Sequence, residues 1–130
     1  MKIGELATRA GCLVETVRFY EREGLLPPPD RTENNYRSYR QEHADRLGFI
    51  RHCRSLDMAL DEIRTLLDLR DRPDQDCGDV NALLDRHIDS VSQRIASLTV
   101  LQHQLQHLRS QCSSIDVTRS CAIMAALDAA

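Results

Sequence analysis

Residues 14–27 read VETVRFYEREGLLP, a short amphipathic helix followed by a strong stop signal. Gly24 ends this helix and Pro27 prevents its continuation, because glycine readily adopts the left-handed conformation after a last turn and proline cannot extend a helix. Charged side chains occupy the remaining face of the same pattern. The apolar residues expected on its buried face are Leu13, Val14 and Val17.

A second short helix is expected just before this stretch, over residues 3–10, with Gly11 at its end. Two short helices joined by a tight glycine turn are typical of a helix-turn-helix. Three consecutive prolines then exclude helix. Between short extended arms within residues 31–40, Asn34 and Asn35 tolerate left-handed turn geometry, which predicts a hairpin wing. Tyrosine and arginine alternate along this wing, a pattern suited to a sugar–phosphate backbone.

Two further helices are predicted over residues 42–54 and 60–69, where leucine and isoleucine recur at helical spacing and would close a core under the wing. The polar segment 71–79 then interrupts the helical pattern. We therefore predict a first domain over residues 1–70, which contains the helix-turn-helix and the wing, and a linker over 71–79.

A long helix is predicted over residues 80–112, and its apolar residues recur in steps of four and three. These residues are Leu84, Ile88, Val91, Ile95, Leu98, Leu101, Leu105 and Leu108, with Cys112 at the end. A helix of this length spans about 50 Å, far more than the small first domain could cover. We therefore predict a coiled-coil dimerisation helix, followed by a loop and a short apolar helix over residues 113–130.

Composition limits the class of protein. The chain has 130 residues, a net charge of -3 and only 4% aromatic residues, which favours one small helical protein over a two-domain enzyme or a β-sandwich. Residues 1–54 hold ten basic and eight acidic side chains, whereas the rest hold seven and twelve. The basic front therefore keeps nucleic acid among the possible partners. We expect a cytoplasmic protein with reduced thiols and no membrane segment, and no catalytic motif is recognisable.

Three of the five cysteines form a candidate metal site, namely Cys77 before the long helix, Cys112 at its end and Cys121 nine positions later. Cys77 and Cys112 of one chain are separated by about 50 Å of helix, so they cannot bind one ion together. In an antiparallel dimer, Cys77 of one chain lies near Cys112 and Cys121 of the other, which predicts two equivalent sites. Three thiolates favour soft cations such as lead, cadmium or mercury, and zinc is less favoured.

The remaining cysteines and histidines have simpler interpretations. Cys12 and Cys53 are expected to pack as small hydrophobic residues. His103 and His107 lie one turn apart near Cys112, and their alternation with glutamines favours a solvated face over a ligand role.

The whole chain resembles the MerR family of transcription regulators. The motifs that carry the resemblance are IGELA at 3–7, VETVRFYEREGLLP at 14–27, NNYRSY at 34–39, RLGFIRHCRSLDM at 46–58, LDEIRTLL at 60–67 and the cysteines at 77, 112 and 121. RPDQDCG at 72–78, the spacing between Cys112 and Cys121 and the short apolar tail are most similar to the lead- and cadmium-responsive branch. One departure is the lack of a polar capping residue just before the second helix, at Leu13.

This resemblance implies a winged helix-turn-helix, an antiparallel dimerisation helix, a metal-binding loop and DNA contacts from the second helix and the wing. The DNA-contacting residues that it implies are Thr16, Arg18, Tyr20, Arg31, Asn35, Tyr36 and Arg37, with Arg54 a weaker candidate, and Tyr20 also has a competing interpretation as a core residue. The regulator would repress without metal and, with lead(II) or next cadmium(II) bound, activate by distorting promoter DNA for RNA polymerase. Mercury(II) and zinc(II) are less favoured effectors.

A different function also fits the cysteines. Cys112 and Cys121 could form a disulfide, which would make the chain a thiol redox-sensing transcription regulator. A thiol-using enzyme or a metal-sequestering protein would leave the wing and the basic front without an explanation.

Overall fold

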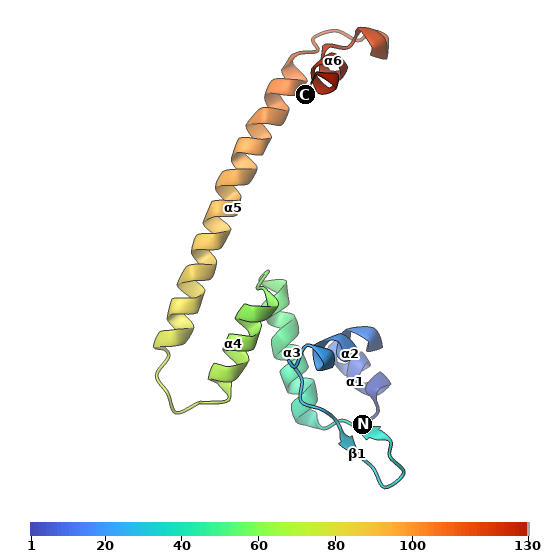
Figure 1. Ribbon diagram of the computed structural model, residues 1–130, viewed down its shortest axis with the longest axis vertical. Coiled ribbons are helices and arrows are strands. Elements are labelled where there is room, and N and C mark those ends of the chain that lie inside the picture. The colour runs from blue at the N-terminus through green and yellow to red at the C-terminus, as the bar shows by residue number, and fades with distance from the viewer. Residues whose placement is uncertain (130) are drawn as a thin grey trace. The chain divides into compact units, whose positions relative to one another are not determined.

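The computed structural model describes residues 1–129 and is mainly helical, as expected. The chain falls into two units, Met1–Leu83 and Leu84–Ala130, and each is described by itself. The elements are α1 (Ile3–Ala10), α2 (Val14–Arg22), β1 (Asp30–Arg31), β2 (Arg37–Ser38), α3 (Gln41–Ser55), α4 (Leu60–Arg70), α5 (Gly78–Ser110), the 3-10 turn η1 (Thr118–Ser120) and α6 (Ala122–Asp128) (Figure 1). Within residues 1–129, no helix has the length and apolar character needed to span a membrane.

The turn between α1 and α2 has the form that the sequence predicts. Gly11 caps α1 in the left-handed conformation, with φ of 68°, and its N–H bonds to the carbonyls of Ala7 and Thr8. The guanidinium of Arg51, on α3, donates to the carbonyls of Ala10 and Gly11. A cation here satisfies the last carbonyl groups of α1 and complements the negative end of its dipole. Arg51 thereby ties the helix-turn-helix to α3.

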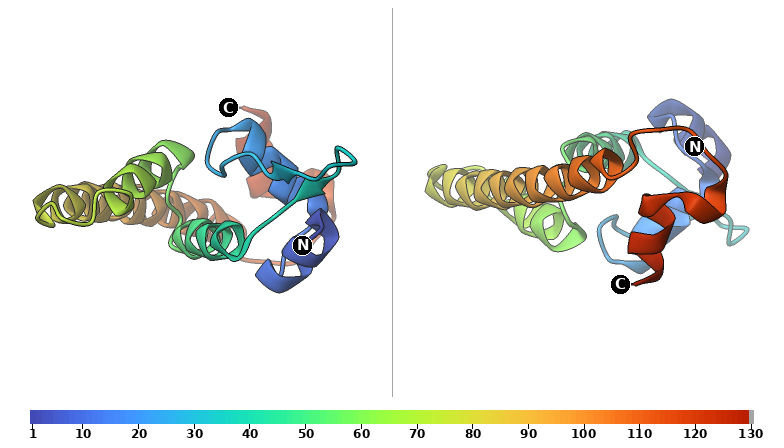
Figure 2. Two further views of the ribbon diagram at one scale, coloured as in Figure 1. Left: turned by 90° about the horizontal axis from the view of Figure 1, so that it is seen from below. Right: turned by 90° about the horizontal axis from the view of Figure 1, so that it is seen from above.

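The core of the first unit lies among α1, α2, α3 and α4, and the start of α5 completes it through Leu83. Figure 2 shows the α1–α2 pair beside α3, with the hairpin loop projecting from this group. The most deeply buried side chains are Leu6, Val17, Leu25, Tyr39, His43, Leu47, Ile50, Ile63 and Leu67. The predicted core beneath the wing is therefore confirmed.

His43 is the one fully buried polar side chain of the residues described, and its ring has a partner on each side. Nδ1 accepts the backbone N–H of Arg40 at 3.0 Å, and Nε2 lies 3.3 Å from the carbonyl oxygen of Pro28. The rings of His43 and Tyr39 also form a T-shaped pair, with their centroids 5.3 Å apart. Sequence reasoning assigned no role to this histidine, which joins the proline-rich segment to the start of α3.

The wing is a two-stranded antiparallel hairpin in which Asp30 pairs with Ser38. Asn35 turns it with φ of 64°, the left-handed geometry predicted for this residue. Glu21 of α2 accepts a hydrogen bond from the hydroxyl of Tyr39 and lies 3.7 Å from the guanidinium of Arg37. Burial, followed by the bond to Glu21, raises the pKa of Tyr39 to about 12, so the hydroxyl remains a donor that holds the wing against α2.

One side chain differs from the prediction. Leu13 was expected on the buried face of α2, together with Val14 and Val17, but its side chain is 74% exposed. The reason is that Leu13 lies one residue before the helix, in extended conformation with φ of -84° and ψ of 152°. The helical periodicity that buries Val17 therefore does not apply to it.

Two substitutions on neighbouring residues of α3 are expected to change stability in opposite directions. Leu47 is fully buried, so Leu47→Ala lowers the free energy of unfolding by about 2–5 kcal/mol. Gly48 is exposed, and a Cβ there meets no heavy atom within 4 Å. Gly48→Ala therefore raises the free energy of unfolding by about 0.5–1 kcal/mol. Urea unfolding followed by circular dichroism, at one protein concentration, measures both, and a change of the same sign in the two variants contradicts this packing.

The second unit consists of most of α5 and the segment after it. Helix α5 runs without interruption from Gly78 to Ser110, close to the predicted 80–112. Its apolar side chains from Leu84 to Leu105 are exposed in the single chain, including every member of the predicted seam in that range. After Ser110 a loop leads to η1 and then to α6, the short apolar helix that the sequence predicts within residues 113–130.

Candidate metal centre and nucleic-acid interface

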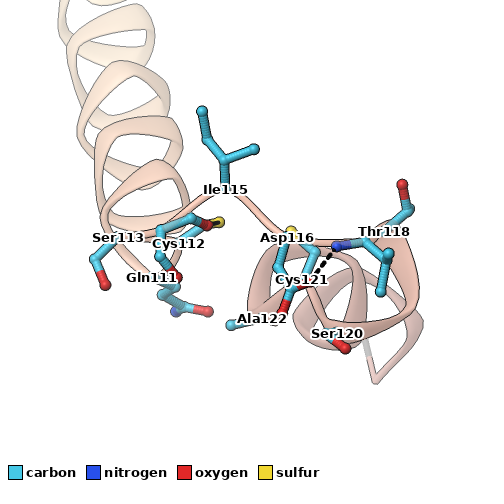
Figure 3. A pocket seen from close by; sticks show the side chains of 11 residues that line it. Gln111, Cys112, Ser113, Ile115, Asp116, Thr118, Ser120, Cys121 and Ala122 are labelled. Carbon is cyan, nitrogen blue, oxygen red and sulfur yellow. Dashed lines mark hydrogen bonds between the residues drawn. The ribbon is translucent and has the colours of Figure 1, made fainter.

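Cys112 and Cys121 lie at the two ends of the loop between α5 and α6, and both line one open pocket of about 340 Å³ (Figure 3). Cys112 follows the last residue of α5 by two positions, and its thiol donates to the carbonyl oxygen of Ser114 at 3.2 Å. Cys121 is the residue that precedes α6. The rest of the pocket wall comes from the loop itself, so folding of this short segment brings the two thiols together.

Local donors stabilise the thiolate of Cys121. The backbone N–H groups of Met124 and then Ile123, in the first turn of α6, hold the pKa of the Cys121 thiol below its usual value. Desolvation opposes them, whereas the side chain of Cys112 and the charge of Arg109 act with them. Because the thiolate is the form that binds metal, this loop favours the reactive state of Cys121.

Cys77 lies in the first unit, directly before α5, and its side chain is exposed. The side-chain amide of Asn81 donates to its sulfur at 3.8 Å. Asp76 accepts the N–H of Gly78 at 2.9 Å, which caps the start of the helix. Within residues 1–129 of one chain, no three histidine, cysteine, aspartate or glutamate side chains form a group that could hold a metal ion. A single chain therefore brings two of the three predicted thiols to one pocket.

The donors that are present fit a soft cation. Two thiols line one pocket, one of them has a lowered pKa, and the third predicted ligand is an accessible thiol at the start of a helix. Thiolate sulfur is the ligand that soft and borderline metals prefer.

The other two cysteines have packing environments, as predicted. Cys53 is buried in the core of the first unit and Cys12 packs against that core. Burial raises the pKa of both thiols, and the charge of Arg51 offsets part of this effect at Cys12. Both thiols are therefore poor metal ligands. His103 and His107 are exposed on α5.

Arginines from α2 and the wing meet around one pocket of about 390 Å³ in the first unit. Arg18 and Arg22 of α2 and Arg37 of β2 line it, together with Ile3 and Glu21. Arg18 pairs with Glu15 at 3.1 Å and remains half-exposed. Sequence reasoning left out Arg22, although its position one turn after Arg18 was the available signal. Three guanidinium groups in one place suit phosphate and guanine edges.

The other predicted DNA contacts fall into two groups. On the wing, Asn35 and Tyr36 are exposed, and Arg31 donates to the carbonyl oxygen of Asn35 at 3.1 Å, which orders the hairpin tip. Thr16 is half-buried on α2. Arg54 is exposed near the end of α3 and donates to the carbonyl oxygen of Met58.

Tyr20 does not have the environment expected of a DNA contact. Its side chain is only 7% exposed and belongs to the core cluster of the first unit, beside the ring of Phe19. The helical face that carries Val17 also carries Tyr20, so burial of one brings the other inward. Tyr20 is therefore a packing residue.

The residue before α2 makes no side-chain cap, as its identity predicts. Ser, Thr, Asp or Asn at such a position typically adds about 1 kcal/mol of stability relative to a residue without a polar side chain. Helix α2 thus begins without the usual side-chain acceptor.

Family models match most of the chain. A model described as MerR HTH family regulatory protein matches residues 1–69, and one described as MerR, DNA binding matches residues 44–108. The two together extend from the helix-turn-helix to the last part of α5.

Relatives with solved structures are similar over nearly the full length. The chain is 54% identical to the transcription regulator PbrR691 from Ralstonia metallidurans CH34, crystallised in complex with lead(II), with 98% of each chain covered and a TM-score of 0.88. It is 32% identical to MerR from Bacillus megaterium MB1 in complex with mercury(II), covering 98% and 99% of the two chains with a TM-score of 0.77. A ZntR homolog from Haemophilus influenzae, an HTH-type transcriptional regulator, is 48% identical over 116 residues, 89% of this chain and 86% of the relative.

Proposed function

Because the chain belongs to the MerR family of transcription regulators, we propose that it is a metal-responsive, promoter-binding repressor and activator without catalytic activity. Its effector is a soft divalent heavy metal, lead(II) first and cadmium(II) next, ahead of mercury(II) and zinc(II). The observation that carries the proposal is the pair of thiols, Cys112 and Cys121, on one pocket at the end of a helix whose apolar seam is exposed.

The DNA-binding half of the proposal rests on the first unit. Helix α2 follows a helix-turn-helix turn, and the wing beside it carries exposed arginine and tyrosine side chains. In such motifs the second helix enters the major groove and flanking segments contact the backbone. We assign base and phosphate contacts to Thr16, Arg18, Arg22, Arg31, Asn35, Tyr36, Arg37 and, more weakly, Arg54.

The dimer follows from the seam of α5. The seam begins at Leu84, and its leucine, isoleucine and valine side chains as far as Leu105 are exposed in the single chain. Burial of such a stripe against a second copy is the usual solution for a long amphipathic helix. An antiparallel pairing places the start of one α5 beside the end of the other, so that Cys77 of one chain completes the pocket formed by Cys112 and Cys121 of its partner.

The preference for lead(II) rests on the donor set and on the lead(II) complex of the relative that is 54% identical to this chain. Three thiolates without a fixed fourth ligand suit a large, soft cation better than zinc, which takes a tetrahedral set. The bound cation supplies a cross-link between thiolates of two subunits.

The proposed activation is a distortion of promoter DNA. A two-fold symmetric dimer binds two half-sites, and a change in the disposition of its subunits bends or untwists the DNA between them. The metal-bound dimer then presents the promoter in a form that RNA polymerase can use. A site shared by two chains couples metal binding to subunit disposition, because the metal favours whichever arrangement aligns the three thiolates.

Removal of Arg18 is expected to weaken operator binding. Arg18→Ala costs about 1–3 kcal/mol if the guanidinium contacts a base, and the loss then concentrates at one base position of each half-site. Arg22→Ala weakens binding more uniformly and lowers the salt slope by about 1 if this side chain contacts phosphate. Fluorescence anisotropy with the operator duplex at several salt concentrations measures both. Arg86→Ala, an exposed arginine of α5, is the matched control, and equal affinity of Arg18→Ala and this control contradicts the assignment.

A second candidate function is favoured by one observation. The two thiols of one chain line the same pocket, and the side chain of Cys112 helps to lower the pKa of Cys121. A peroxide could oxidise them to a disulfide, in which the two thiols lose two protons and two electrons to the oxidant. Mass spectrometry after mild peroxide treatment, beside a lead(II) titration of the reduced protein, separates this redox sensor from the metal sensor.

A further inference from the structure

The side chain of Leu13 belongs neither to the core of the first unit nor to the apolar residues packed against that core. It is the most exposed large hydrophobic residue of residues 1–83, with 74% of its surface accessible. It precedes α2 in extended conformation, after the left-handed turn at Gly11, and it forms no capping hydrogen bond. Its neighbours in sequence behave differently, since Cys12 and Val14 both pack against the core.

Stability favours a different residue at this position. A serine, threonine, aspartate or asparagine would accept a free N–H of the first turn of α2, and it would not expose an isobutyl group to water. Leucine cannot accept this hydrogen bond, and at Leu13 it also exposes apolar surface to water. Where local sequence breaks such rules without a compensating contact inside the fold, the residue is expected to act in a complex.

The position of Leu13 identifies the complex. It marks the N-terminal end of α2, the end at which a recognition helix contacts base edges in the major groove. The exposed side chains of α2 are otherwise mainly charged, with Glu15, Arg18 and Arg22, and the apolar Phe19, 38% exposed, lies beside the buried ring of Tyr20. The major groove offers one apolar group on its base edges, the 5-methyl group of thymine. An aliphatic side chain at this end of the helix matches that group and has no hydrogen-bonding alternative.

We propose that Leu13 is a specificity-determining residue that packs against the 5-methyl group of a thymine in each half-site of the operator. This inference rests on the proposed binding of DNA by α2. The contact is apolar on both sides, so it discriminates thymine from the other bases without a contribution from charge. Arginines fix affinity and orientation in this arrangement, whereas Leu13 adds sequence preference.

Replacement of single thymines by deoxyuridine tests the proposal, because this change removes the methyl group and keeps every hydrogen-bonding group of the base. The probe is a duplex that the full-length dimer selects from a random pool. We expect one thymine in each half-site at which deoxyuridine weakens binding by about four-fold, the effect of one buried methyl group. Leu13→Ala is expected to bind the thymine and deoxyuridine duplexes with equal affinity.

A second variant separates recognition from folding. Leu13→Asn supplies the missing cap, so we expect its melting temperature to rise while its discrimination between thymine and deoxyuridine disappears. Val100→Ala, which shortens an exposed aliphatic side chain of α5, is the matched control and keeps the full four-fold effect.

Two results would overturn this proposal while leaving the proposed DNA binding intact. In the first, no replacement of a thymine by deoxyuridine weakens binding by the wild-type protein to its selected duplex. In the second, the Leu13→Ala variant discriminates between the thymine and deoxyuridine duplexes as strongly as the wild type does. A wild-type protein that selects no duplex at all overturns the proposed DNA-binding function itself, and this inference with it.

Discussion

Replacement of Cys77, Cys112 or Cys121 singly by serine is expected to abolish lead(II)- and cadmium(II)-dependent transcription from the target promoter and to leave operator binding by the metal-free protein unchanged. A hydroxyl is a poor ligand for a soft cation, so each variant loses one of three sulfur donors. Mutation of residues that only orient metal ligands typically lowers metal affinity about 10–100-fold. Loss of a ligand itself is therefore expected to lower metal affinity by more than about 100-fold. A reporter assay with lead, cadmium, mercury, zinc and copper, beside gel retardation without metal, measures both properties.

Mixed dimers determine whether the site is shared between chains. A dimer of one Cys77→Ser chain and one Cys112→Ser chain retains one complete site if the ligands come from two subunits, and none if they come from one. A dimer of one wild-type chain and one chain with both substitutions shows the inverse pattern. Lead(II) bound per dimer, measured on purified heterodimers with two affinity tags, separates the two arrangements.

Cys12→Ser is the matched control, because Cys12 is a partly buried thiol that packs against the core of the first unit. It should respond to metal as the wild type does. If all three serine variants of the proposed ligands still induce with lead(II) and cadmium(II), the assigned site is wrong, whatever the behaviour of this control.

Ile95→Glu is expected to dissociate the dimer. Ile95 is 60% exposed in the single chain and lies in the middle of the seam, so a two-fold symmetric dimer would bury two copies of the new carboxylate. The loss of two buried side chains, at about 1.5–3 kcal/mol each, raises the dimer dissociation constant by about 100- to 10,000-fold before any cost of burying charge. Operator affinity and metal response should fall together, because both depend on the paired state.

Val100→Glu distinguishes this effect from a general effect of charge on α5. Val100 is also exposed, at 58%, but it lies outside the four-and-three pattern of the seam. Analytical ultracentrifugation should show a dimer for Val100→Glu and a monomer for Ile95→Glu at the same concentration. A dimer in both cases would contradict the proposed interface, and a monomer in both would place Val100 inside it.

Much of the fold was predictable from local sequence. Gly11 and Gly24 mark helix ends through left-handed geometry, and Asn35 does the same at the tip of the wing. These signals depend on the backbone conformation of single residues, which the residue type limits strongly. The long helix was predictable because its apolar spacing continues without glycine or proline from Asn81 to Ser110.

Side-chain environments were less predictable, since they depend on packing between elements. Tyrosine is a residue type that can contact DNA, but Tyr20 lies on the buried face of α2. Leucine is a residue type typical of a core, but Leu13 precedes the first turn of α2. The helical period therefore does not set the direction of its side chain. The partners of His43 are a carbonyl fifteen residues earlier and a backbone N–H at the start of α3, a combination that has no sequence signature.

In the candidate metal site, too, some features were predictable from the sequence and others were not. The sequence named Cys112 and Cys121 among three candidate ligands, and the structure places both thiols on one pocket. The lowered pKa of Cys121 was not predictable, because it depends on N–H groups in the first turn of α6. Completion of the site by Cys77 of a second chain stays a prediction.

Leu83, near the start of α5, is the last of the described residues that packs into the core of the first unit, and this position affects the order of folding during synthesis. A growing polypeptide exposes its N-terminal part first, and domains generally fold as units in that order. The first unit can therefore reach its final packing while the rest of α5 and the loop with Cys112 and Cys121 are still being synthesised. In the proposed dimer, pairing is then a later, concentration-dependent step between first units that are already folded. A chain that ends soon after Leu83 is expected to fold without pairing and without the proposed metal response.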